Sequence, residues 1–123
     1  MLRPAGFFRE LGHGDGRPGE PSIQDYLHSP SPQKAKVVAY LLNGHLYAVA
    51  AGVSVDIFRS PERHIIGGLT LLTDGIWLWP SDLPYYVQGY DVAIAVDFAE
   101  HMRAQGWTVP TLTSEDLRAL RRS

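Results

Sequence analysis

The spacing of apolar and polar residues predicts several helical segments along the chain. Apolar residues that recur every three to four positions indicate helix, because they then share one face. Pro, Ser or Thr near the start of such a segment, and Gly or Asn-Gly after it, are residues that commonly begin and end helices. The expected helices cover approximately 22–27, 32–43, 81–90 (capped by Ser81) and 93–105, with a last helix starting at Thr113 or Ser114.

Extended segments occupy the middle of the chain. The expected strands are 45–50, 53–58, 65–72 and 76–79, with Gly52 as a break or bulge between the first two. Asp74-Gly75 indicates a hairpin between the last two strands, because this pair tolerates the positive φ angles of a type I′ turn. The pattern predicts an α+β fold with a small, mostly antiparallel sheet of about 3–4 strands, packed against helices on one side.

The length of the chain fits one domain. With 123 residues it is too short for two ordinary cores, and 45% hydrophobic residues suffice for one. We expect a single domain over 1–123, in which residues 1–21 form a Gly/Pro-rich loop and residues 22–123 form the globular α+β body.

The residue types exclude several kinds of chemistry. The chain has no cysteine, so disulfides, thiolate metal sites and a cysteine nucleophile are excluded. No two histidines have the spacing of a helical zinc site, and no serine lies in a glycine-flanked nucleophile turn. The sequence therefore predicts no metal, no cofactor and no catalytic residue. The histidines are His13, His28, His45, His64 and His101.

The overall charge and hydropathy limit the partners. The formal net charge of −2 lacks the basic excess of a nucleic-acid-binding protein, so no nucleic-acid partner is expected. No apolar run is long enough to span a membrane, and the first ten residues lack the apolar region of a signal peptide. These features predict a cytoplasmic location and no membrane partner.

Acidic residues are concentrated between residues 74 and 100. This segment carries five carboxylates and no Lys or Arg, which gives it a charge of −5, and it is rich in Trp and Tyr. Trp77 and Trp79 lie two positions apart on a strand and therefore point to the same face. They either pack under the helix of residues 81–90 or form an exposed aromatic shelf, and the sequence leaves both open.

These observations favour a non-enzymatic protein-binding module, such as an adaptor or an immunity-type protein. Aromatic residues are frequent in interface hot spots, and surrounding carboxylates would attract a basic protein partner. The residues expected to bind this partner are Asp74, Trp77, Trp79, Asp82, Tyr85, Tyr86, Tyr90 and Asp91.

Two alternatives remain. One is a small-molecule binder or small enzyme with a pocket between the sheet and the C-terminal helices, lined by Trp77, Tyr86, His64 and His101. The other is a structural homodimer subunit, in which a second copy covers an apolar strand face. A closed pocket where a histidine meets a carboxylate would favour the first, and self-association would favour the second.

The segment Leu71-Leu72-Thr73-Asp74-Gly75-Ile76-Trp77-Leu78-Trp79-Pro80-Ser81-Asp82-Leu83-Pro84-Tyr85-Tyr86-Val87 resembles a family of small uncharacterised actinobacterial proteins. The resemblance extends over approximately 44–110, with Asp97-Phe98 and His101-Met102 as further similar points. No activity is known for this family, so the resemblance implies a bacterial cytoplasmic setting and assigns no functional residue.

Overall fold

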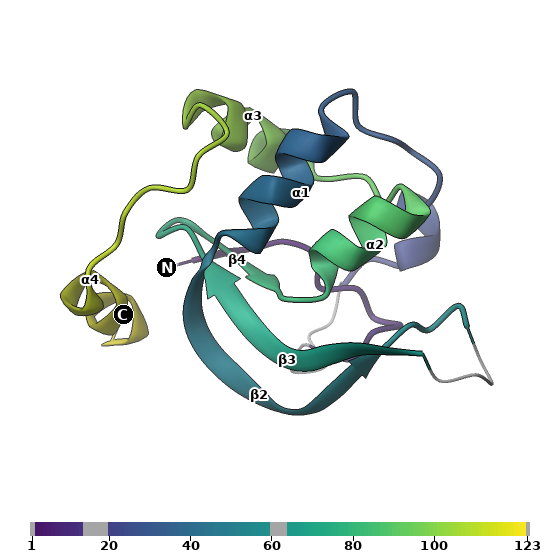
Figure 1. Ribbon diagram of the computed structural model, residues 1–123, viewed down its shortest axis with the longest axis horizontal. Helices are drawn as coiled ribbons and strands as arrows, with labels where there is room; N and C mark the ends of the chain where they lie inside the picture. The colour runs from purple at the N-terminus through teal and green to yellow at the C-terminus, as the bar shows by residue number, and fades with distance from the viewer. Residues whose placement is uncertain (1, 14–19, 60–63, 123) are drawn as a thin grey trace.

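The structure is a computed structural model that describes residues 2–13, 20–59 and 64–122 (Figure 1). It has the α+β fold that the sequence predicts. The strands are β1 (Arg3–Pro4), β2 (His45–Val55), β3 (Ile65–Thr73) and β4 (Trp77–Pro80). The helices are a 3-10 turn η1 (Ile23–Tyr26), α1 (Lys34–Leu42), α2 (Leu83–Tyr90), α3 (Val96–Ala104) and α4 (Ser114–Arg122).

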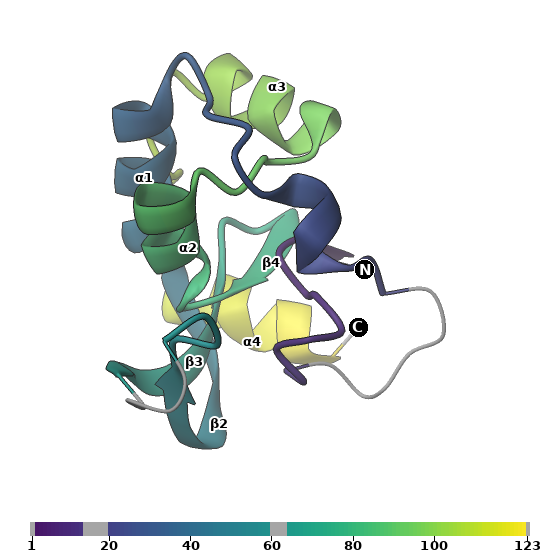
Figure 2. The ribbon, with the colours of Figure 1, turned by 90° about the vertical axis from the view of Figure 1, so that its right-hand side faces the viewer.

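The four strands form one sheet in the order β1-β4-β3-β2. β2, β3 and β4 are antiparallel neighbours, whereas β1 is parallel to β4. Helices α1, α2 and α3 lie together on one side of the molecule, while α4 lies apart from them near the first residues of β2 (Figures 1 and 2). Because β2 is the last strand in the order, one of its edges has no neighbouring strand among the described residues.

The two strands expected at 45–50 and 53–58 are one strand. β2 continues through Gly52, whose φ of +91° accommodates an irregularity that the sequence indicates as a break or bulge. The pairing of β2 with β3 shifts register at three places, between Leu46 and Ala48, between Val49 and Val53, and between Ser54 and Val55. Such bulges bend a strand, and the β2–β3 hairpin is strongly curved in Figure 1.

The segment before residue 22 is more than the expected loop. Arg3 and Pro4 pair with β4, and Phe8 is 4% exposed and belongs to the hydrophobic core. Residues 14–19, where most of the predicted Gly-rich stretch lies, are outside the described residues. The Ser22 cap of the first short helix is confirmed, since its side chain accepts a hydrogen bond from the backbone N–H of Gln24.

Two local predictions about residues 74–82 are wrong. Gly75 has φ +100°, but Asp74 does not have a positive φ, so the hairpin turn is not of type I′. The N-cap of α2 is Asp82, while the Ser81 hydroxyl accepts a hydrogen bond from the backbone N–H of Thr70. A serine beside a sheet has backbone donors from another strand within reach, and the local pattern does not contain that information.

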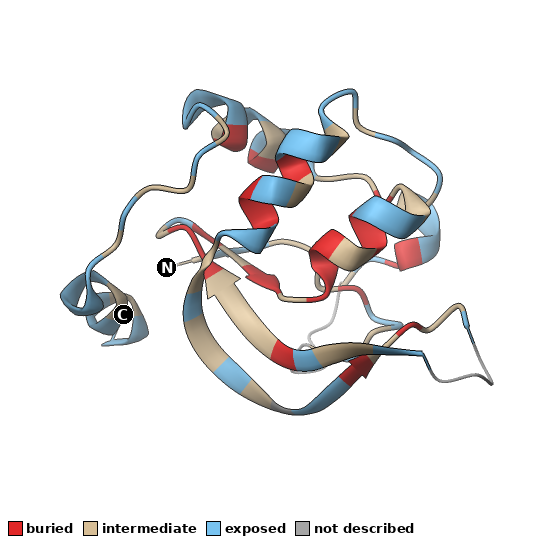
Figure 3. Ribbon diagram, viewed as in Figure 1, coloured by how far each residue is buried: buried red, intermediate tan, exposed pale blue. Residues whose placement is uncertain are grey.

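The core lies between the helices and the sheet. Trp77 stacks on Phe98 with 4.5 Å between ring centroids, and Tyr40 and Trp79 pack around the same phenylalanine. Figure 3 shows the buried positions of α1, α2 and α3 on the sides that face inward. The largest fully buried side chains are Trp79, Tyr40, Tyr86, Phe98, Ile23, Leu41, Leu83 and Met102.

Candidate functional site

Most of the predicted partner-binding residues are inside the protein. The side chains of Asp74, Trp77, Trp79, Asp82 and Tyr86 are buried, each at 4% exposure or less. The prediction that these five residues form part of a binding surface is therefore corrected, because three of their rings belong to the core and both of their carboxylates are enclosed. The three remaining predicted residues, which are partly exposed, are Tyr85, Tyr90 and Asp91.

Asp74 joins the β3–β4 turn to two helices. Its Oδ1 accepts hydrogen bonds from the backbone N–H groups of Ile76 and Trp77, at 2.9 and 2.7 Å. Its Oδ2 accepts one from the Tyr40 hydroxyl at 2.5 Å and lies 3.0 Å from Nε2 of His101. Burial is the main cause that raises the pKa of Tyr40, and the adjacent Asp74 carboxylate raises it further. Asp74 thus satisfies donors from three parts of the chain.

Asp82 has a similar but incomplete set of partners. Its Oδ2 accepts a hydrogen bond from the Ser54 hydroxyl at 2.6 Å and pairs with Nε2 of His13. Its Oδ1 is buried and has no hydrogen-bond partner among the described residues. The order of groups is Ser–Asp–His, with the carboxylate in the middle. In nucleophilic catalysis the histidine must lie between the other two, because it takes the hydroxyl proton.

Both His–carboxylate pairs are largely enclosed. His13 and His101 have only 10% and 16% of their side-chain surface exposed. The linings of the three cavities described for this structure include neither histidine, and Trp77 and Tyr86 are also absent from them. A histidine does meet a carboxylate, as the enzyme alternative requires, but not in the closed pocket that this alternative expects. The enclosure of both pairs favours a structural role, in which they stabilise the folded protein.

A third buried carboxylate, Asp56, organises the tyrosines of α2. Its Oδ2 accepts hydrogen bonds from the hydroxyls of Tyr85 and Tyr90, both at 2.6 Å. Burial acts to raise the pKa of Asp56, but these two hydrogen bonds and that from Phe58 N–H lower it overall. The hydrogen bond to Asp56 raises the pKa of Tyr90 to about 12. The polar ends of both tyrosines are therefore already engaged within the protein.

A groove lies beside these tyrosines, between α1, α2 and β3. Its volume is about 610 Å³, which is within the range of small-molecule sites. Leu42 at its border is 63% exposed. The groove is lined mainly by Val38, Leu42, Ile66, Pro84, Tyr85 and Gln88.

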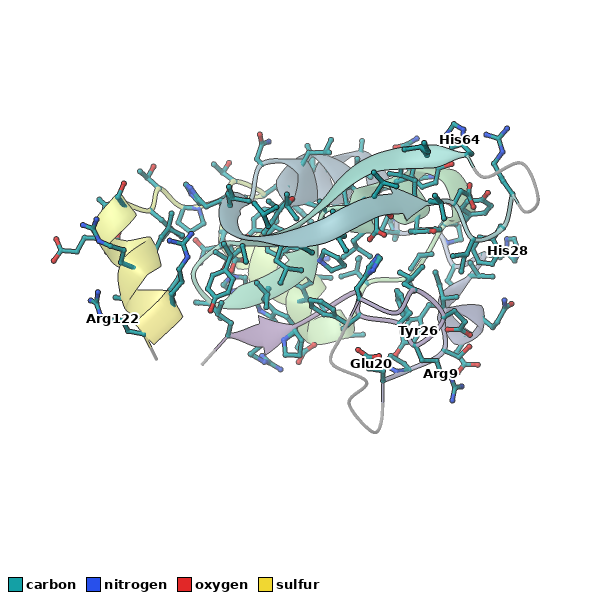
Figure 4. The ribbon with its side chains drawn as sticks, turned by 90° about the horizontal axis from the view of Figure 1, so that it is seen from below. Arg9, Glu20, Tyr26, His28, His64 and Arg122 are labelled. Atoms are coloured by element: carbon teal, nitrogen blue, oxygen red, sulfur yellow. The ribbon has the colours of Figure 1, made fainter. Side chains whose placement is uncertain are left out.

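A smaller cavity of about 280 Å³ lies along the N-terminal segment. Glu20 and Tyr26, which belong to its lining, are labelled in Figure 4. Phe7 and Phe8 contribute to the apolar part of this cavity. The described lining of this cavity contains one carboxylate, that of Glu20, and no histidine.

The outer strand β2 carries a row of exposed apolar side chains. Leu46, Val49 and Val53 are 49%, 73% and 60% exposed. They lie opposite Leu72, Thr70 and Gly68, which alternate along β3. Cross-strand partners share a face, so the bulges in β2 place all three side chains on one face of the hairpin. We call Leu46, Val49 and Val53 the β2 stripe.

The β2 stripe was not predicted from the sequence. Its members are three and four positions apart, whereas side chains on one face of a regular strand are two apart. The two bulges between them change the alternation, and only the pairing with β3 reveals that the three residues share a face. Figure 3 shows exposed positions along β2, in agreement with these values.

Helix α4 contacts the first residues of β2 through Arg121. The Nε of Arg121 donates to the carbonyl of Tyr47 at 2.8 Å, and its Nη2 donates to the carbonyl of Leu46 at 3.3 Å. The guanidinium also lies 5.8 Å from the centre of the Tyr47 ring. Figure 4 shows the α4 end of the molecule, marked by Arg122, opposite the hairpin end marked by His64. We call the two carbonyls and the Tyr47 ring the arginine seat.

Comparisons with models of known protein families, with curated proteins and with solved structures find no match for this chain. Within the described ranges, no three His, Asp or Glu side chains are grouped so that they could hold a metal ion. The helices of the described part of the chain also lack the length and apolar character that crossing a membrane requires.

Proposed function

We propose that the protein is a non-enzymatic protein-binding module whose binding face is the β2 stripe. The observation that carries this proposal is the alignment of Leu46, Val49 and Val53 on one exposed face of the outermost strand. Single exposed apolar residues are common, whereas a continuous row of them is typical of a surface that a partner covers.

The surroundings of the β2 stripe support this role. Cβ atoms added at Gly52 and Gly68, which flank Val53 along and across the hairpin, would meet no other atom within 4 Å. The absence of side chains at these positions leaves Val53 accessible from several directions. Among the described residues, this space would let a partner approach Val53.

The proposal replaces the predicted surface but retains the predicted class of function. Asp74 and Asp82 are enclosed and cannot attract a basic partner directly, so the recognition is apolar at the stripe. A second copy of the chain is one partner that would cover it, as in the homodimer alternative. Neither a nucleic acid nor a membrane is proposed as a partner.

A pair of matched variants tests the site. Val49 and Val96 are 73% and 74% exposed, and they lie on β2 and α3 respectively. We expect Val49→Glu to abolish capture of a partner by the immobilised protein, because a carboxylate would have to be desolvated in the interface. Val96→Glu, with the same change of side chain, should leave capture unchanged.

The captured protein must then be identified, purified and titrated against the wild type and both variants. An increase in Kd of at least about tenfold for Val49→Glu alone supports the proposal, which corresponds to about 1.4 kcal/mol. Equal affinities for the three proteins would contradict it. Light scattering of the wild type over a range of concentrations shows whether the partner is a second copy.

The groove between α1, α2 and β3 supports a second candidate function, the binding of a small molecule. Its apolar lining and its volume of about 610 Å³ are the specific observations in its favour. Leu42→Arg would place a charge at its border while leaving the β2 stripe intact. A metabolite that raises the melting temperature of the wild type but not of Leu42→Arg would support this candidate.

A further inference from the structure

We propose that the arginine seat on β2 is a binding site for an arginine-bearing amphipathic helix of a partner protein, and that α4 occupies this seat until the partner displaces it. This inference rests on the proposed function and specifies the chemistry of the partner. The seat consists of the carbonyls of Leu46 and Tyr47 and the Tyr47 ring.

The seat has a composition suited to a guanidinium group. A guanidinium has several N–H donors in a planar fork, and it also interacts favourably with an aromatic face. Tyr47 is the extra residue in the first bulge of β2, since Leu46 pairs with Leu72 and Ala48 pairs with Leu71. The two adjacent carbonyls that accept from Arg121 therefore flank the bulge, which interrupts the regular ladder there.

Helix α4 shows which kind of segment fits the seat. Leu117, Leu120 and Arg121 are three and four positions apart and thus share one helix face. The two leucines are half-buried, whereas all other described residues of α4 are exposed. The recognised unit is therefore an apolar residue, a second apolar residue three positions later, and an arginine directly after it.

Helix α4 lies outside the hydrophobic core, so its displacement would leave the core intact. None of its side chains is buried, and it is absent from the hydrophobic core. The described hydrogen bonds that connect it to the sheet come from Arg121 and are exposed to solvent. Leu46 belongs both to the arginine seat and to the β2 stripe, so a partner helix on the stripe would reach the carbonyls that Arg121 now binds.

The test uses the full chain and a fluorescent peptide with the sequence of residues 112–123. In the wild type the peptide must compete with α4 of the same chain, which is present at a high effective concentration. Arg121→Ala removes the arginine of this internal competitor and leaves the residues of the seat unchanged. We expect the peptide to bind Arg121→Ala at least about tenfold more tightly than the wild type. Arg121→Lys, which lacks the planar fork, should also bind the peptide more tightly than the wild type does.

Three controls make the result specific. Arg118→Ala removes an exposed guanidinium from the same helix and should leave the affinity at the wild-type value. A peptide with alanine in place of the arginine that corresponds to Arg121 should bind poorly to every variant. Tyr47→Ala, added to Arg121→Ala, should weaken binding several-fold because it removes the aromatic part of the seat. Circular dichroism confirms that each variant is folded.

Equal affinity of the peptide for the wild type and Arg121→Ala would overturn the inference, as would no binding to Arg121→Ala. The inference would also be overturned if the arginine-free peptide bound Arg121→Ala as tightly as the original peptide does. These failures are distinguishable from failure of the proposed function. If Val49→Glu loses the captured partner while the peptide results are negative, the β2 stripe is a binding face and only the displacement of α4 is wrong.

Discussion

Asp74 and Asp82 each pair with the Nε2 of one histidine and accept a hydrogen bond from one hydroxyl, but only Asp74 has both of its carboxylate oxygens bonded. The difference lies at Oδ1, which accepts two backbone N–H groups in Asp74 and has no partner among the described residues in Asp82. Since both side chains are enclosed, this difference should determine how much stability is lost when each carboxylate is replaced by a neutral amide.

Replacement of each carboxylate by an amide tests this relationship. In Asp74→Asn the amide N–H₂ either faces the two backbone N–H donors of Ile76 and Trp77 or requires the Tyr40 hydroxyl and His101 to change their hydrogen-bonding roles, so we expect a loss of about 2–4 kcal/mol in the free energy of unfolding. In Asp82→Asn the N–H₂ can take the place of the unpartnered Oδ1, and we expect a loss of about 1 kcal/mol. Urea denaturation of both variants measures the two values. A larger loss for Asp82→Asn would show that the pairing with His13 outweighs the unpartnered oxygen.

The sequence predicted the elements better than the site. Local signals identified the helices, the hairpin and the last strand, because capping residues and apolar spacing act over a few positions. The pairing of Arg3 and Pro4 with β4 was missed, since a parallel partner far away in the chain leaves no local pattern.

The prediction that Asp74 and Asp82 lie on the surface failed for a physical reason. A cluster of carboxylates in the sequence indicates a solvent-exposed face only when the protein supplies no hydrogen-bond donors to them. Here Asp74 and Asp82 receive donors from Tyr40, Ser54 and two histidines that are distant in the sequence. The β2 stripe remained hidden because bulges removed the two-residue period by which an exposed face is normally recognised.

The tyrosines bonded to Asp56 make the stability depend on pH at both extremes. The pKa of Tyr90 is raised from 10.0 to about 12, so the stability it contributes is complete below pH 10 and is lost as the pH rises toward 12. The pKa of Asp56 is lowered from 3.8, so its contribution is complete above that pH and is lost as the pH falls through the lower folded value.

Asp56→Asn should therefore reduce both dependences. We expect the pKa of Tyr90 to fall from about 12 toward 10.0, because the hydrogen bond to a carboxylate is the largest cause of its increase. Ultraviolet absorbance of tyrosinate during an alkaline titration measures this change. Tyr90→Phe, introduced into both backgrounds, identifies the part of the absorbance change that belongs to Tyr90. An unchanged titration in Asp56→Asn would contradict the assigned cause.

Two glycines are expected to respond to alanine in opposite ways. A Cβ at Gly44 would lie 2.5 Å from Cζ2 of Trp79 and 2.9 Å from Cβ of Leu72, so Gly44→Ala must move buried groups and should cost about 1–3 kcal/mol. A Cβ at Gly89 in α2 meets nothing within 4 Å, and Gly89→Ala should stabilise the helix by about 0.5–1 kcal/mol. Thermal unfolding measures both. A similar effect of the two changes would show that the contact with Trp79 is easily relieved.

The start of α4 provides a way to loosen this helix without changing the arginine seat. Thr113 and Asp116 cap each other, since the N–H of Asp116 donates to the Thr113 hydroxyl at 3.0 Å and the N–H of Thr113 donates to Asp116 Oδ2 at 2.9 Å. Thr113→Ala removes one of these bonds, which should cost about 1 kcal/mol of helix stability. Because α4 has no buried side chain, this loss should stay local.

We therefore expect Thr113→Ala to accelerate amide hydrogen exchange throughout α4 while the free energy of global unfolding changes by less than about 0.5 kcal/mol. Thr111→Ala, at an exposed threonine before the helix, is the matched control and should change neither quantity. If α4 is displaced by partner helices, Thr113→Ala should also bind the labelled peptide more tightly than the wild type. A loss of global stability as large as the local one would instead show that α4 unfolds together with the core, and displacement by a partner would then require unfolding of the whole domain.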